Sequence, residues 1–484
     1  MLKAIMSELM SRPKTPRSRV VVTGLGAVTP MAVGVEASWR ALCRGESGIK
    51  LVRRFGTSGM RTRIGGENQD FVAADFVDSK MEKHFDRFVL LAVAASKMAA
   101  EDAGLEVRQP DSRRIGVVIG NCLGGASLVE QGLEQVFHGN GKRMSPFFIP
   151  GIIGSSAAGV VAIVLRARGP NLAVNSACAS GADAVGYGLK MLRNGEVDVV
   201  IAGGTEAPIT PLLYHGFTAL GATSARNDEP ERASRPFDRE RDGFVPAEGA
   251  GMLVLEELDF AMSTGAKIYA EAVGFGSSCD AYHITSPDPR AEGAAAAMTN
   301  ALRDAGIATE EVDYVNAHGT STRLNDRVES MAIRKVFDGR VAHLPVSSCK
   351  SVTGHTIAAA GALEAIFSIL AIRDGIVPPT VNYESSDPEC DLDYVPNIPR
   401  KQDIRTVLSN SFGFGGANTS LVLRRWNGRS VRPTARAALR RQAGVKETPR
   451  LANPPAVELA PIASMTVTAT GAGGREEPRG ASST

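Results

Sequence analysis

The feature that most constrains the fold of this chain is a regular alternation of short apolar runs with helical segments. The apolar runs end in glycine or a polar turn, and they cover 19–26, 114–120, 172–174, 197–203, 251–256, 268–276, 312–318, 346–348 and 406–410. Segments with helical patterning lie between them, at 35–43, 85–103, 179–192, 293–306 and 356–373. Such runs predict buried strands, and strands that alternate with helices predict an α/β fold with largely parallel sheets covered by helices.

Composition indicates a large folded body with a polar end. The chain has 484 residues, 43% of them hydrophobic and 51 of them glycine, which suits a compact protein with a substantial core. From Trp426 onward Arg, Ala, Pro, Thr and Gly dominate, with nine Lys or Arg against four Glu, so the tail carries +5 and the rest −3 of the net +2. We expect 426–484 to be a disordered basic tail. A mildly acidic body gives no reason to expect nucleic acid as a partner.

The cysteines and the N-terminal residues indicate in which cellular compartment the protein works. The six cysteines are scattered, with no C-x-x-C pair and no His/Cys ligand spacing, which argues against disulfides or zinc and for a reducing compartment such as the cytoplasm. We expect residues 1–18 to form a flexible leader, which is basic and lacks the apolar core of a signal peptide; a mitochondrial presequence stays open as an alternative. The longest apolar run, 356–372, is short for a bilayer span and contains Glu364, so we expect a core helix.

One stretch combines a nucleophile with a strand-to-helix junction. The apolar run 172–174 is followed by Cys178 and then by a segment, 179–192, that is small or apolar on most faces. A thiol at a helix N-terminus feels the positive end of the backbone dipole, which lowers its pKa and favours the thiolate. A buried structural cysteine is the alternative, since most single cysteines serve that purpose.

Three later segments supply further reactive groups. Val315–Thr322 places His318 in a turn directly after a strand, and Ser347–His355 supplies Lys350 and His355 just before a helix. Asn410–Asn418 is dense in glycine around Phe414 and offers free backbone N–H groups. Ligands bind at the carboxyl ends of strands in α/β sheets, so reactive residues in these positions point to a shared site.

Together these four segments, in this order, resemble the β-ketoacyl-ACP synthases of fatty acid synthesis, closest to the type II enzymes. The likeness runs from about Arg19 to Arg425 and includes the motifs Ser234–Phe244 and Asp387–Pro396. It implies a thiolase-like fold of two similar βαβ-rich halves, with central helices layered between sheets. We expect the first half at 19–267, carrying Cys178, and the second at 268–425, carrying His318, Lys350 and His355.

The residues make chemical sense for that family. Joining two thioesters through carbon needs a soft nucleophile to hold one acyl chain, and Cys178 suits this task. Malonyl thioester that loses CO₂ leaves an enolate, and two imidazoles, His318 and His355, can donate hydrogen bonds to its oxygen. The resemblance assigns the second oxyanion hole to the backbone N–H groups of Cys178 and Phe414. No cofactor or metal ion is required.

Several acidic residues and one phenylalanine are candidates for supporting roles that do not involve contact with the reacting atoms. Glu364 sits in an otherwise apolar helix, and pairing with Lys350 is the economical explanation for a buried carboxylate. Asp326 and Glu329 suit either an exposed acidic helix start or a site role. The resemblance makes Phe414 a gate that glycines free to move.

Other expectations concern substrates and partners. The resemblance places Thr320 and Thr322 on the phosphopantetheine arm and Leu123 and Phe148 in the acyl pocket, with Phe148 reaching across a homodimer interface. The expected partner is acyl carrier protein, which is acidic, so Lys80, Lys83 and Arg87 are candidate docking residues. Gly221 departs from the family pattern, because many family members carry arginine at this position, so we expect carrier docking to differ in detail.

Three alternatives remain at this point. One is the ketosynthase subunit of a type II polyketide or specialised fatty acid system. Another is a non-catalytic partner like the chain-length factors, which lack the nucleophilic cysteine. The third is a thiolase, which uses a second cysteine late in the chain, whereas no cysteine follows Cys390 here.

Overall fold

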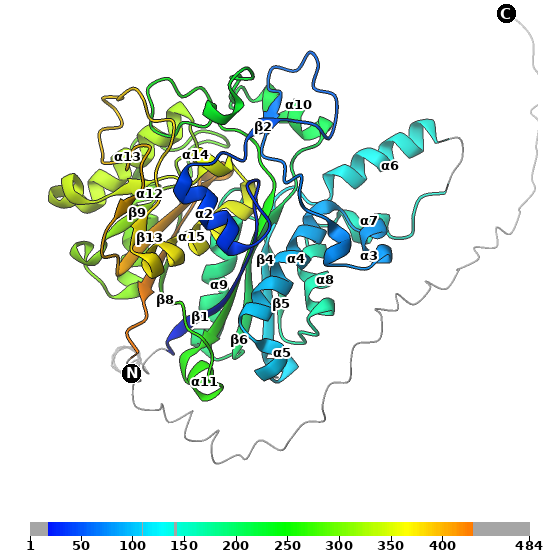
Figure 1. The fold of residues 1–484 in the computed structure, drawn as a ribbon, viewed down its shortest axis with the longest axis horizontal. Coiled ribbons are helices and arrows are strands. Elements are labelled where there is room, and N and C mark those ends of the chain that lie inside the picture. The colour runs from blue at the N-terminus through cyan, green and yellow to red at the C-terminus, as the bar shows by residue number, and fades with distance from the viewer. Residues whose placement is uncertain (1–17, 109, 140–142, 429–484) are drawn as a thin grey trace, which may run out of the picture. The chain divides into compact units, whose positions relative to one another are not determined.

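The computed structural model describes residues 18–108, 110–139 and 143–428 (Figure 1). Its main sheet has ten strands in the order β10-β9-β13-β14-β8-β1-β7-β6-β4-β5. These strands are β1 Val20–Val28, β4 Ile115–Gly120, β5 Asn171–Val174, β6 Val199–Glu206, β7 Gly249–Glu257, β8 Ala270–Cys279, β9 Tyr314–Asn316, β10 Val346–Ser347, β13 Thr406–Gly413 and β14 Ala417–Arg425. Two short pairs lie apart from it, β2 Lys50–Leu51 with β3 Ile64–Gly65 and β11 Ile376–Val377 with β12 Arg400–Lys401.

The ten strands consist of two five-strand halves with the same topology. The first half runs β5-β4-β6-β7-β1 and the second β10-β9-β13-β14-β8, so each strand of one half has a counterpart in the other. In the sheet, the two halves are joined where Val21 and Val22 of β1 pair with Glu271 and Ala270 of β8. This duplication confirms the expected α/β architecture of two similar halves. The exact domain limits, 19–267 and 268–425, stay a prediction.

The expectation of largely parallel sheets is only partly correct. Parallel pairing joins β4 to β5 and β6 in the first half, and β9 to β10 and β13 in the second. The remaining neighbours are antiparallel. The reason is clearest at β13 and β14, which are joined by the three-residue turn Phe414–Gly416, and a connection that short must reverse the chain. Strand β14 was missing from the sequence interpretation.

Helices form the layers around these strands. They are α2 Val35–Arg44, α3 Ser79–His84, α4 Arg87–Asp102, α5 Leu105–Arg108, α6 Ala126–His138, α7 Phe148–Ile152, α8 Ser156–Val164, α9 Ser180–Asn194, α10 Pro211–Ala219, α11 Leu258–Ser263, α12 Glu292–Ala305, α13 Arg323–Phe337, α14 Lys350–Thr353 and α15 Ala360–Asp374. Helix α9 packs against strands of both halves, as does α15, and the two contact each other (Figure 1). Helix α4 packs on β1, β6 and β7, and α12 on β8 and β14. The expected central helix layer is therefore present.

The two central helices approach closely because small residues line their contact. A Cβ added to Gly361 of α15 would lie 2.7 Å from the Cβ of Ala182, and one added to Gly181 of α9 would lie 2.5 Å from the carbonyl oxygen of Ala358. Every residue of α15 from Ala360 to Ile372 is buried, as expected of a helix that is apolar on nearly all sides. In the described part of the chain, no helix has both the length and the apolar character to cross a membrane.

Strand β5 differs from its expected environment. The run 172–174 was predicted to be a buried strand, but β5 is the last strand of the sheet and pairs only with β4. Its side chains are largely exposed, and Leu172 keeps 46% of its accessible surface. Apolar composition predicted the strand, but it could not predict that the strand lies at an edge, because strand order is set by tertiary contacts.

Both ends of the folded body meet at β1. Trp426, which the sequence placed at the start of the tail, packs near the beginning of β1, with the Arg19 guanidinium 4.9 Å from its ring centroid. The rest of the predicted tail from residue 429, and the leader up to residue 17, lie outside the described residues.

The central helix contact generates a stability prediction. Gly361→Ala should lower the free energy of unfolding by ~1–3 kcal/mol, because the added methyl group meets Ala182 in a packed layer. Gly216→Ala in α10 is the matched control, since a Cβ there meets no atom within 4 Å and alanine is the better helix former. Urea denaturation of both variants checks this, and equal stabilisation by the two substitutions would contradict the packing account.

Candidate active site

Cys178 lies in a tight turn between β5 and α9. Ala177 has φ +51°, an uncommon conformation for a residue with a side chain. The Ser180 hydroxyl stabilises the turn, since it accepts from the backbone N–H of Ser176 at 2.9 Å and donates to the carbonyl of Ala177 at 2.6 Å. Cys178 is thereby fixed just ahead of the first turn of α9.

The two predicted histidines face each other. His318 follows β9, and its backbone N–H and that of Gly319 each donate to Glu329 at 2.8 Å. His355 follows α14, and its N–H donates to the carbonyl of Val245 at 2.8 Å. The two ring centroids are 5.4 Å apart and the rings are nearly perpendicular, at 85°. Both side chains are buried.

Behind the histidines lies the expected ion pair. The Lys350 ammonium contacts the Glu364 carboxylate and lies 3.3 Å from Nδ1 of His318. Lys350 is 1% exposed and Glu364 2%, so the pair is shielded from water. Burial raises the pKa of Glu364 to about 7, and the Lys350 ammonium opposes that rise.

The surroundings of the two imidazoles set their charge and tautomer. Burial, and then the Lys350 ammonium, hold the pKa of both His318 and His355 well below the ordinary value, so both rings are neutral at neutral pH. Nδ1 of His355 accepts from the N–H of Ile357 at 3.3 Å, and Nδ1 of His318 faces the Lys350 ammonium. Because each Nδ1 faces a donor, the ring proton lies on Nε2 in both histidines.

The thiol differs from its expected state. Burial raises the pKa of Cys178 to about 12, whereas the sequence analysis expected the helix N-terminus to lower it. The Lys350 ammonium and the backbone N–H groups of Phe414 and Cys178 oppose this rise without overcoming it. These two N–H groups are the ones that the resemblance assigned to an oxyanion hole, and both interact with the thiol. Cys178 is therefore a thiol at rest, held beside the groups that stabilise negative charge.

Phe414 stands at the turn between β13 and β14. Its side chain is exposed, and Gly415 and Gly416 after it have φ of +81° and +78°, which only glycine adopts readily. On the other side, a Cβ at Gly413 would lie 2.6 Å from the carbonyl oxygen of Ser176. The turn therefore approaches the Cys178 turn closely while leaving the Phe414 ring open to solvent.

One cavity of about 420 Å³ connects the Cys178 thiol, the two imidazoles and Phe414, whereas Lys350 and Glu364 are not among its lining residues. Of the residues predicted from the sequence, it is lined by Cys178, His318, His355, Phe414, Thr320, Thr322 and Leu123. The hydroxyls of Thr320 and Thr322 lie 2.8 Å apart. Phe148 is not among the lining residues; its ring packs on α6, 2.5 Å from where a Cβ at Gly132 would stand.

The sequence analysis missed part of the cavity wall. Phe244 packs edge-on against His355, with ring centroids 5.5 Å apart. Cys122, Phe217 and Ile357 line the cavity near Cys178. Phe244 ends the motif Ser234–Phe244, which was the one available signal. The others look like ordinary core residues in sequence.

Asp326 and Glu329 are both fully buried on α13, so their interpretation as an exposed acidic helix start is wrong. Burial raises the pKa of Glu329 to about 7 against the backbone and Asn410 hydrogen bonds that it accepts. Its contacts with His318 and Gly319 fix the backbone of that turn, so it acts behind the site.

Of the docking candidates, Lys80 and Lys83 are exposed on α3. The Arg87 guanidinium is not free to bind an acidic partner, because it donates to the buried Glu248 and to the carbonyl of Asn68, all at 2.8–2.9 Å. Gly221 lines the cavity with φ +66°, and the Arg61 guanidinium lies 3.9 Å from where its Cβ would stand. Within the described residues, no group of three or more His, Cys, Asp or Glu could hold a metal ion.

Comparison with known proteins agrees with this geometry. The family model "Beta-ketoacyl synthase, N-terminal domain" matches residues 17–261, and "Beta-ketoacyl synthase, C-terminal domain" matches 269–384. The chain belongs to the β-ketoacyl synthase family. A β-ketoacyl synthase is a condensing enzyme that transfers an acyl group, and this identification confirms the resemblance drawn from the sequence.

Individual relatives of this β-ketoacyl synthase cover nearly all of the folded body. The 3-oxoacyl-(acyl-carrier-protein) synthase 2 of Coxiella burnetii is 49% identical over 409 residues, 84% of this chain and 99% of the relative. The enzyme of the same name from Synechocystis is 47% identical over 410 residues, 85% and 99%. Among solved structures, a β-ketoacyl synthase from Burkholderia phymatum has TM-score 0.79 at 37% identity and covers 85% of this chain and all of that one.

The raised thiol pKa predicts how Cys178 reacts with an alkylating agent. Iodoacetamide reacts with the thiolate, whose fraction rises about tenfold per pH unit below the pKa. The alkylation rate of the Cys178 peptide, followed by mass spectrometry, should therefore keep rising from pH 7 to about 9.5. Exposed Cys279 provides an internal comparison. A rate that levels off below about pH 8.5 would mean that the protein lowers this pKa after all.

Proposed function

We propose that this enzyme joins an acyl chain held on Cys178 to the carbon released when malonyl thioester loses CO₂, giving a 3-oxoacyl thioester. The observation that carries the proposal is geometric: two buried imidazoles, each with Nδ1 beside a donor, share a cavity with a buried thiol. No cofactor or metal ion takes part in this chemistry.

In the first step the Cys178 sulfur attacks the carbonyl carbon of an acyl thioester. The carbonyl oxygen becomes negative and is stabilised by the backbone N–H groups of Cys178 and Phe414. The carbonyl re-forms as the carbon–sulfur bond to the carrier breaks, and the thiol proton of Cys178 passes to the departing thiolate. The acyl chain is then held as a thioester on the enzyme.

In the second step a malonyl thioester occupies the cavity with its thioester oxygen at the two Nε2–H groups. The bond to the carboxylate breaks, CO₂ leaves, and the electron pair forms an enolate that His318 and His355 stabilise by hydrogen bonds. The enolate carbon attacks the acyl group on Cys178. Collapse of that second oxyanion expels the Cys178 thiolate and releases the 3-oxoacyl product, and the thiolate regains a proton before the next cycle.

Lys350 and Glu364 act behind the reacting atoms. The ammonium beside Nδ1 of His318 opposes protonation of that ring, and the Glu364 carboxylate balances the buried ammonium. His318 is thereby kept as a neutral hydrogen-bond donor. A protonated imidazole would instead bind the malonyl carboxylate and oppose its loss.

The rest of the cavity suits the substrate's two ends. Thr320 and Thr322 offer a pair of hydroxyls to the pantetheine arm, and Leu123 offers an apolar wall to the acyl chain. Phe414 acts as a gate, because its exposed ring sits on a turn with two glycines at positive φ. Exposed Lys80 and Lys83 supply positive charge for an acidic acyl carrier protein, and Arg87 drops out because Glu248 engages it.

A homodimer accounts for the open edge of the sheet. Strand β5 exposes its outer edge, and the elements around it expose apolar side chains that water would not favour, Leu133, Val136, Phe137, Ile149, Ile153, Ile163 and Leu172. A second copy that pairs through β5 would cover them and bring Phe148 toward the partner's acyl pocket.

A solved structure supports acyl carrier protein as the partner. One relative, a polyketide ketosynthase, is described in complex with an acyl-carrier protein.

Identity favours fatty acid elongation as the pathway. The curated relatives named 3-oxoacyl-(acyl-carrier-protein) synthase 2 are 44–49% identical, whereas the ketosynthase solved with a type II polyketide acyl-carrier protein is 37% identical. The nucleophile Cys178 speaks against a chain-length factor, and His355 speaks against a thiolase. Six free cysteines suit the reducing cytoplasm.

Separate assays of the two half-reactions test the proposal. Cys178→Ala should abolish transfer of a radiolabelled acyl group from acyl carrier protein, because no nucleophile remains. His318→Ala should lower malonyl decarboxylation by a factor of ~10²–10³, the usual cost of one lost oxyanion donor. His343→Ala is the matched control, since His343 is exposed and does not line the cavity. Undiminished decarboxylation in His318→Ala would refute the proposed role of the imidazoles.

A further inference from the structure

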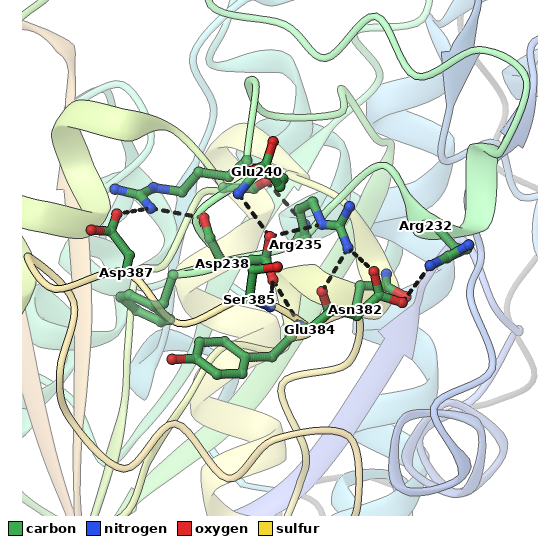
Figure 2. Close-up of polar contacts among 12 residues, drawn as sticks. Arg232, Arg235, Asp238, Glu240, Asn382, Glu384, Ser385 and Asp387 are labelled. Carbon is green, nitrogen blue, oxygen red and sulfur yellow. Dashed lines mark hydrogen bonds and ion pairs between the residues drawn. The ribbon is translucent and has the colours of Figure 1, made fainter.

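The motif Ser234–Phe244 forms a polar network with the segment Asn382–Asp387. Arg232 and Arg235 converge on Glu384, and Arg235 lies 2.6 Å from it (Figure 2). Asp238 accepts from the backbone N–H groups of Glu384 and Ser385 at 2.7 Å and from that of Glu240 at 2.8 Å (Figure 2). The reaction described above uses none of these charged side chains.

One member of this motif, Arg241, reaches toward the active site. Its Nη1 donates to the Asp387 carboxylate at 2.6 Å and to the carbonyl of Asp238 at 2.8 Å. On its other side Nε donates to the carbonyl of Thr322 at 3.3 Å, and Nη2 donates to the carbonyl of Arg323 at 3.2 Å. Arg241 is 2% exposed, so a buried guanidinium connects the outer network to the turn that carries Thr322.

That turn is held in an unfavourable backbone shape. Ser321, between Thr320 and Thr322, has φ +66°. Its carbonyl accepts from the N–H of Gly243 at 3.1 Å, and its hydroxyl accepts from the N–H of Arg235 at 2.9 Å. A non-glycine residue keeps such a conformation only where its surroundings enforce it.

Asp326 of α13 also restrains the backbone of the Thr320–Thr322 turn. Its carboxylate accepts from the N–H of Phe237 at 2.8 Å, hydrogen-bonds the backbone of Thr320, and lies 3.6 Å from Nε of Arg241. The motif therefore contacts Ser321 and Thr322 directly, and it reaches Thr320 through Asp326. The same chain segment continues to Phe244 and Val245, which contact His355.

We propose that Arg241 is a positioning residue for the pantetheine arm, which it serves by holding the Thr320–Thr322 turn in its bound shape. This rests on the proposed function, in which the two threonine hydroxyls receive that arm. Arg241 touches no reacting atom. Its loss should therefore weaken binding of the arm far more than it affects the chemistry at Cys178.

The test compares Arg241→Lys with Arg235→Lys. Both arginines are buried, at 2% and 3% exposure, and both belong to the same motif and network. Lysine keeps the charge opposite the buried carboxylates but loses the planar fork, which at Arg241 spans the carbonyl of Thr322 in the turn and that of Arg323 directly after it. The Arg235 guanidinium instead engages Asn382, Glu384 and Asp238, and among the hydrogen bonds of the described residues only the backbone N–H of Arg235 reaches Ser321.

Decarboxylation of malonyl-pantetheine gives the readout. Arg241→Lys should raise KM roughly tenfold with kcat within about threefold, as expected when positioning alone is lost. Arg235→Lys should leave KM within about twofold, and both variants should match the unmodified enzyme in iodoacetamide labelling of Cys178. Asp387→Asn, which removes the outer anchor of Arg241, should raise KM in the same direction and keeps the test open if Arg241→Lys does not fold.

An equal rise of KM in Arg241→Lys and Arg235→Lys, or no rise in Arg241→Lys and Asp387→Asn, would overturn the role proposed for Arg241. Absence of decarboxylation by the unmodified enzyme would instead overturn the proposed function. The two failures are therefore distinguishable in one set of assays.

Discussion

The buried contact between Lys350, Glu364 and His318 is the interaction on which the rest of the site depends. Removing an ion pair from water is costly, and a lone charge at this depth would be more costly still. The carboxylate comes from α15, the central helix that contacts both halves of the sheet, so the charge balance of the site is built into the core. Burial, reinforced by the ammonium, keeps His318 neutral, and because the ammonium faces Nδ1 it also fixes the tautomer of that ring.

The duplicated topology explains why distant residues meet. Cys178 follows β5, His318 follows β9, Lys350 follows β10 and Phe414 follows β13, and each is placed just past the carboxyl end of a strand. In the repeat, β5 corresponds to β10 and β4 to β9. Each half therefore presents its reactive groups at the corresponding edge, with α9 and α15 packed between the halves.

Much of this was predictable from the sequence, and the rest depended on tertiary contacts. Apolar runs predicted most strands, and reactive side chains after strands or just before a helix predicted Cys178, His318 and His355, which line one cavity. Strand β14 was missed because it follows the glycine-dense turn directly, and β5 was wrongly expected to be buried because strand order is not local. The thiol pKa was misjudged because burial outweighs the helix N-terminus. Arg241 contacts Thr322 across 81 residues, so no local pattern could reveal the role proposed for it.

Nitrogen-15 NMR of histidine side chains tests the central claim most directly, because it reports the charge and the tautomer of each imidazole. The chain has seven histidines, and His318→Asn and His355→Asn variants assign the two signals that matter. The account predicts that both rings stay neutral between about pH 6 and 8, with the proton on Nε2. A ring that becomes charged in this range, or that carries its proton on Nδ1, would contradict it.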